Sequence, residues 1–96
     1  MQFAVFKELL KTNEPPELGL YLKSLWFDAK GEWAKAHDLI DDIQTMDAYW
    51  LHGYLHRKEG DLGNAAYWYS KAGKKSPSNP LEQEWNDLVA YFLEKE

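Results

Sequence analysis

The chain has 96 residues, no cysteine and a formal net charge of -5. This length favours one domain with a limited core, and the lack of cysteine excludes disulfides, thiolate metal sites and cysteine nucleophiles. The acidic balance argues against a nucleic-acid partner bound through its phosphates. No apolar run approaches the roughly 20 residues of a membrane-spanning helix, so we expect no membrane partner.

The chain is rich in aromatic residues, with five Trp, six Tyr and four Phe. Side chains of this size dominate burial in cores and interfaces, so we expect some of them at a recognition surface. Alternatively, the aromatic residues that the core does not bury form a homodimer interface, because symmetric dimers are common. The segment MQFAVFKELLK has neither a basic leader nor a small-residue cleavage site. We therefore expect no signal peptide and a cytoplasmic location, which the absence of cysteine also fits.

Two segments with the same pattern occupy the middle of the chain. Residues 20–43 and residues 49–72 align when Gly31 is placed over Gly60, and each reads as a helix, a glycine turn and a second helix. The hairpins that contain them span residues 17–44 and 46–75. Glycine adopts the left-handed conformation that ends a helix without a Cβ clash. Ala36 and Ala65 supply small side chains where the two helices of a hairpin approach. The sequence therefore predicts two antiparallel helical hairpins.

Further helices flank the two hairpins. Apolar spacing predicts a short N-terminal helix that carries Phe3 and Phe6, and a C-terminal helix over residues 80–95. Within the second hairpin, Thr45 and Asp61 are expected to cap the helices that follow them, because their side chains accept backbone N–H bonds. The predicted fold class is all-α, and residues 1–96 form one helical-repeat-like domain. The C-terminal helix caps the second hairpin, as terminal helices do in repeat proteins.

The second hairpin resembles a tetratricopeptide repeat. The matching aromatic, glycine, alanine and proline positions are Tyr49, Gly53, Gly60, Ala65, Tyr69, Ala72 and Pro77. The first hairpin keeps Gly31, Ala36 and an apolar Ile40 from this pattern. The string HRKEGDLGNAAYWYSKAG also resembles one in short bacterial and fungal proteins, and this likeness implies no activity. The repeat resemblance implies a tetratricopeptide-like stack with a concave, ligand-facing side on the first helix of each hairpin.

One face of the predicted helix Met46–Glu59 combines aromatic and cationic side chains. Residues spaced at i, i+4, i+7 and i+8 share a face, and the resemblance makes this face concave. With the equivalent positions of the first hairpin, the face comprises Tyr21, Asp28, Trp50, Tyr54, Arg57 and Lys58. Such a groove predicts binding of an extended protein or peptide, with Arg57 pairing a carboxylate of that partner. Alternatively, the aromatic residues pack on the terminal helices and the charges are solvated.

Three histidines form another candidate site. His52 and His56 lie one helical turn apart, a spacing that suits one metal ion. His37 is placed to approach them across the hairpin interface, with Asp38 or Asp41 nearby. The alternative is a structural network, because buried histidines are usually neutral and hydrogen-bonded. We favour this network, and we therefore expect no bound metal. The available hydrogen-bond partners of the histidines are Glu59, Asn64 and Tyr67.

No catalytic motif accompanies these two sites. The sequence lacks a phosphate-binding loop, a dinucleotide fingerprint and a serine-centred triad motif, so we name no catalytic residue. It therefore predicts a non-catalytic adaptor that binds a protein or peptide, works without a cofactor and is not an enzyme. The alternative function is a small metal-binding protein or enzyme that uses His37, His52 and His56.

Overall fold

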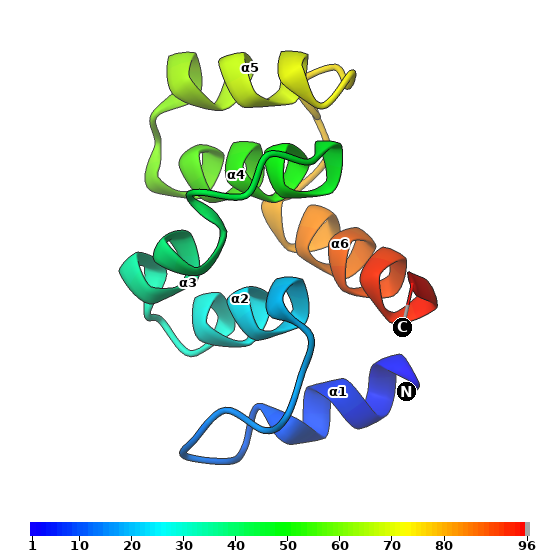
Figure 1. Ribbon diagram of the computed structural model, residues 1–96. Coiled ribbons are helices and arrows are strands. Elements are labelled where there is room, and N and C mark those ends of the chain that lie inside the picture. Colours follow the sequence, from blue (N-terminus) through cyan, green and yellow to red (C-terminus); the bar gives the residue numbers. More distant parts are fainter. Residues whose placement is uncertain (96) are drawn as a thin grey trace.

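All the regular secondary structure in the computed structural model, which describes residues 1–95, is helical (Figure 1). In chain order the helices are α1 (Phe3–Leu9), α2 (Leu20–Ala29), α3 (Trp33–Ile40), α4 (Met46–Glu59), α5 (Leu62–Lys71) and α6 (Leu81–Lys95). The predicted all-α class is confirmed. Within residues 1–95, each helix is too short or too polar to cross a lipid bilayer.

The middle four helices form two helical hairpins that stack on one another. Helix α2 packs against α3 and α4 packs against α5, while α3 lies against α4 (Figure 1). The two hairpin turns are made by Gly31 at φ 81° and Gly60 at φ 90°. A Cβ is strained in this left-handed region, so glycine is required at both turns. The glycine turns expected from the sequence are confirmed.

Side-chain caps fix where the helices of the second hairpin begin. The Thr45 hydroxyl accepts a hydrogen bond from the backbone N–H of Ala48 at 3.0 Å. The Asp61 carboxylate accepts one from the backbone N–H of Asn64 at 3.3 Å. Both caps match the sequence prediction, and each contributes about 1 kcal/mol to helix stability. The Thr45 cap fixes where α4 begins, and α4 carries residues of both candidate sites.

The terminal helices complete the core. Helix α6 packs against α2 and α4, and α1 packs against α6 (Figure 1). The apolar stripe of α6 faces inward, where Leu88 and Phe92 are buried together with Leu25, Leu51 and Leu55. Each fully buried side chain of this kind contributes about 1.5–3 kcal/mol. Helix α6 is therefore an integral part of the core.

Candidate functional site

The aromatic part of the predicted peptide-binding face lies under α6. The Trp50 ring contacts Tyr91 and Phe92, with centroids 5.3 and 6.5 Å apart, and its Nε1 donates to Glu84 at 3.1 Å. The Tyr21 ring stacks on Phe92 at 4.7 Å. Of the two alternatives that the sequence left open for these residues, packing on a terminal helix is therefore the one observed, because the apolar stripe of α6 packs on them.

The cationic part of the same face pairs with a carboxylate from the chain itself. Arg57 donates to Glu84 Oε1 at 2.9 Å and to the backbone carbonyl of Asn79. The Tyr69 hydroxyl lies 2.7 Å from both Glu84 oxygens. Burial and the hydrogen bond to Glu84 raise the pKa of Tyr69 above its ordinary value, so this hydroxyl stays a donor. Arg57 thus pairs a carboxylate of α6, whereas the sequence prediction was a carboxylate of a bound partner.

The other end of the predicted face borders an open pocket. Asp28 is buried and accepts hydrogen bonds from the Tyr54 hydroxyl at 2.6 Å and from Lys58 Nζ at 2.7 Å. Burial and the charge of Asp28 raise the pKa of Tyr54, which keeps its hydroxyl protonated. The pocket measures about 330 Å³, and its other lining residues are Lys7, Leu10, Ala29, Leu81, Glu82 and Trp85.

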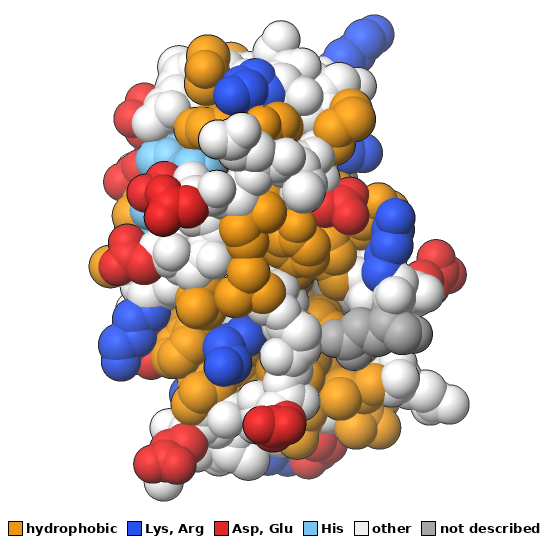
Figure 2. Space-filling model, in the orientation of Figure 1, with side chains coloured by type: hydrophobic (Ala, Val, Ile, Leu, Met, Phe, Trp, Pro, Cys, Tyr) orange, Lys and Arg blue, Asp and Glu red, His pale blue; other side chains and the backbone are white. Residues whose placement is uncertain are grey.

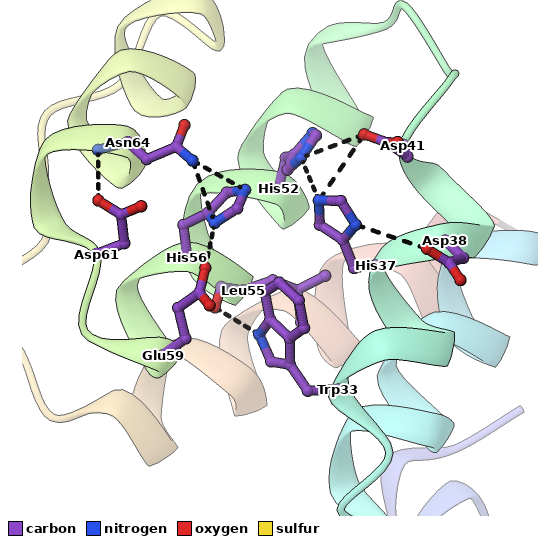
Figure 3. A network of polar contacts seen from close by, with 10 residues as sticks. All are labelled: Trp33, His37, Asp38, Asp41, His52, Leu55, His56, Glu59, Asp61 and Asn64. Atoms are coloured by element: carbon purple, nitrogen blue, oxygen red, sulfur yellow. Dashed lines mark hydrogen bonds and ion pairs between the residues drawn. The ribbon is translucent and has the colours of Figure 1, made fainter.

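The histidines converge between α3 and α4 (Figure 3). His37 on α3 and His52 on α4 place their Nε2 atoms 2.9 Å apart. Asp41, which follows the last residue of α3, places its Oδ1 atom 3.8 Å from each of those two nitrogens. The end of the first hairpin and the first helix of the second therefore bring three potential metal ligands close together.

His56 completes the cluster from the next turn of α4. Its Nδ1 lies 2.6 Å from Glu59 Oε2, and the Asn64 amide lies 3.4 Å from both of its ring nitrogens. Donor atoms of His37, His52 and His56 all lie within 4.8 Å of one another. Glu59 and Asn64 are partners that the sequence suggested, whereas the exposed Tyr67 packs edge-on against the neighbouring Trp68 instead.

Two tryptophans form walls of the histidine cluster. The Trp68 ring stacks on His52 with centroids 3.9 Å apart and an interplanar angle of 10°. The Trp33 ring stacks on His37 at 4.9 Å and 14°. Sequence reasoning missed both walls, although Trp33 lies four residues before His37 and so on the same helical face. Trp68 comes from α5, and no local pattern links it to His52.

The electrostatics keep His52 neutral at pH 7. Burial, followed by the nearby His37 and His56, lowers its pKa to about 4, and the carboxylate of Asp41 only partly opposes this. Histidine side chains nevertheless reach the surface beside acidic ones in Figure 2. Asp41 is the accessible member, with 53% of its side chain exposed. The cluster is thus buried on the α4 side and open to solvent on the Asp41 side.

These two sites differ in their chemistry. The pocket beside Asp28 offers apolar walls with charged groups at the rim, and the histidine cluster offers nitrogen and oxygen donors for a cation. Comparison of the chain with protein-family models, with characterised proteins and with solved structures finds no match. The geometry of the two sites is therefore the guide to function, since a fold class alone does not determine it.

Proposed function

We propose that the protein binds a divalent transition-metal ion between α3 and α4. The support is the triangle formed by His37 Nε2, His52 Nε2 and Asp41 Oδ1, whose sides are 2.9, 3.8 and 3.8 Å. A point equidistant from the corners of a triangle with these sides lies about 2.1 Å from each. Protein Zn–N and Zn–O bonds are about 2.0–2.2 Å long. The three donors are therefore close enough together to reach one ion once it replaces the hydrogen bond between the two Nε2 atoms.

The chemistry of the donors favours the same class of ion. Imidazole and carboxylate ligands suit Zn²⁺, Ni²⁺, Cu²⁺ and Co²⁺. A histidine must be neutral to bind a metal, and the lowered pKa of His52 meets that condition at pH 7. Outer groups that hold a ligating ring in place strengthen such sites. Here Asp38 lies 3.9 Å from His37 Nδ1, and the two tryptophan rings stack on the ligands.

The substitution Asp41→Asn tests this proposal with little risk to the fold. Untagged wild-type protein is expected to bind one Zn²⁺ or Ni²⁺ per chain by titration calorimetry. Asparagine keeps the size of Asp41 but removes the charge, so affinity is expected to fall at least about tenfold. Asp42→Asn is the matched control, because Asp42 is the next residue and is also exposed.

Tryptophan fluorescence gives a second readout of the same titration. Trp33 and Trp68 stack directly on His37 and His52, so Ni²⁺ or Cu²⁺ bound there should quench their emission. Quenching is expected in the wild type and in Asp42→Asn, and only at higher metal concentration in Asp41→Asn. Absence of both heat and quenching, or equal affinity of the two variants, would count against metal binding at this site.

We further propose that the two hairpins are divergent tetratricopeptide-like units. Gly31 and Gly60 take up the same left-handed conformation at equivalent turns, and Ala36 and Ala65 are both buried. In the second hairpin, a Cβ built on Gly53 would lie 3.1 Å from the Tyr69 ring. This close approach supports a pairing of glycine with a later aromatic residue, which is the pattern that the resemblance rests on.

The pocket beside Asp28 supports a second candidate function, binding of a protein or peptide. Three residues of the predicted face, Asp28, Tyr54 and Lys58, line it together with apolar walls. Lys58 Nζ has three protons and donates to the Asp28 carboxylate at 2.7 Å and to its backbone carbonyl at 3.4 Å, so it retains one donor for a ligand. We therefore propose an apolar side chain next to an acidic residue as the recognised element.

Filling the pocket tests the peptide proposal. Peptides selected from a displayed library on the wild type should bind Ala29→Phe at least about tenfold more weakly, because the new ring occupies the apolar space. Ala34→Phe is the matched control, since Ala34 is also an exposed helical alanine but lies outside the pocket lining. Selection of no acidic, apolar sequence, or equal binding by both variants, would contradict the proposal.

A further inference from the structure

We infer that His56 is the fourth ligand of the metal ion proposed above, so that protein side chains close the site. This inference rests on the proposed metal binding and specifies its kind. Structural zinc sites hold four protein ligands, whereas catalytic sites keep one position for water or substrate. His37, His52 and Asp41 supply three donors, and a nitrogen of His56 lies within 4.8 Å of those of the other histidines.

The position of His56 on α4 suits this role. His52 and His56 are one turn apart, and their rings are nearly parallel, with centroids 5.0 Å apart and an interplanar angle of 18°. Side chains at i and i+4 share one face of a helix, so both rings approach α3 from α4. Both are buried, whereas Asp41 is exposed on the opposite side. The three histidines already form one cluster, and the exposed Asp41 carboxylate would swing towards them so that the four donors surround one ion.

The hydrogen bond between His56 and Glu59 favours the histidine tautomer that can bind a metal ion through Nε2. Glu59 Oε2 lies 2.6 Å from His56 Nδ1, so the carboxylate accepts the Nδ1 proton. A ring with its single proton on Nδ1 carries its lone pair on Nε2. Metal-bound histidines almost always donate their other N–H to a carboxylate, a carbonyl or water, which sets this tautomer. Glu59 also places a negative charge just outside the ligand set, where it favours a cation.

Closure by His56 makes the ion a link between the two hairpins. His37 and Asp41 belong to the end of the first hairpin, and His52 and His56 belong to α4 of the second. Trp33 Nε1 already joins the hairpins by donating to the backbone carbonyl of Leu55 at 2.7 Å. A four-ligand ion at this junction holds α3 on α4 and offers no position for a substrate. Its role is structural.

Cobalt substitution tests the inference, because Co²⁺ absorbs visible light according to its coordination. Metal-free wild-type protein loaded with one equivalent of Co²⁺ is expected to show the intense absorption of a four-coordinate ion. Excess azide, a small metal-binding anion, should leave that spectrum unchanged. In His56→Gln the spectrum should respond to azide, because solvent then occupies the fourth position. Circular dichroism of the metal-free variant checks that it is folded.

Glu59→Gln provides a second variant that leaves the core intact. Glu59 is exposed and touches the cluster through His56, so its substitution is expected to weaken Co²⁺ binding about tenfold. The loss in His56→Gln should be larger. A wild-type spectrum that shifts with azide, together with unchanged Co²⁺ affinity in both variants, would overturn the closed site but leave metal binding standing. Absence of Co²⁺ binding to the wild type would overturn both proposals.

Discussion

Replacing Glu84 with alanine is expected to lower the free energy of unfolding by about 3–5 kcal/mol, the range for breaking a buried ion pair. Glu84 is only 3% exposed and accepts hydrogen bonds from Arg57, Tyr69 and Trp50. Alanine leaves the guanidinium of Arg57 without a counter-charge, and it leaves the buried Tyr69 hydroxyl and the partly buried Trp50 Nε1 without this acceptor. An unsatisfied buried donor costs about 1–3 kcal/mol.

Urea unfolding followed by circular dichroism measures this effect. Glu94→Ala is the control on the same helix, because Glu94 is exposed, and its change should stay within about 0.5 kcal/mol. Glu84→Gln keeps the shape and some acceptor capacity but loses the charge, so its stability should fall between the wild type and Glu84→Ala. Equal stability of the Glu84→Ala and Glu94→Ala variants would show that the buried network contributes little.

Local chemistry explains why the helices could be predicted from the sequence. The turns at Gly31 and Gly60 require positive φ, and the caps at Thr45 and Asp61 bond to backbone groups three residues ahead. Each of these features depends on a few adjacent residues. Their physical signals are therefore present in the sequence without knowledge of any tertiary contact.

The covered peptide face shows what local patterns omit. The spacing of Trp50 and Arg57 identifies a shared face of α4, but it does not say what lies on that face. The partner is Glu84, which is 27 residues beyond Arg57 in sequence. One signal was available, because Glu84 lies between Leu81 and Trp85 within the apolar stripe of α6. A charged residue at such a position needs a buried partner.

The histidine cluster could be predicted in part from the sequence. The one-turn spacing of His52 and His56 is local, and the predicted hairpin interface placed His37 near them, with Asp38 or Asp41 beside it. The stacking of Trp68 on His52, by contrast, depends on how α5 lies across α4. The 2.9 Å approach of the two Nε2 atoms depends on the packing of α3 on α4. Neither leaves a periodic signal in the chain.

Metal-free protein is expected to lose stability as the pH falls from about 6.5 towards 4, because of His52. Its pKa is near 6.5 when the chain is unfolded and about 4 in the folded protein. Between these values the unfolded state binds a proton that the folded state does not, so acid favours unfolding. Above the unfolded pKa both states are neutral and the contribution vanishes. The full loss is on the order of 3 kcal/mol.

Comparison with His52→Gln isolates this effect from the titration of the carboxylates, which both proteins share. Urea unfolding in the presence of a chelator, at pH values from about 7.5 to about 4, gives the free energy of unfolding of each. Glutamine takes up no proton in this range, so the wild type should lose more stability than the variant as the pH falls. A constant difference between the two proteins would mean that the folded state protonates His52 as readily as the unfolded chain does. The buried ring, with His37 and His56 beside it, opposes that outcome.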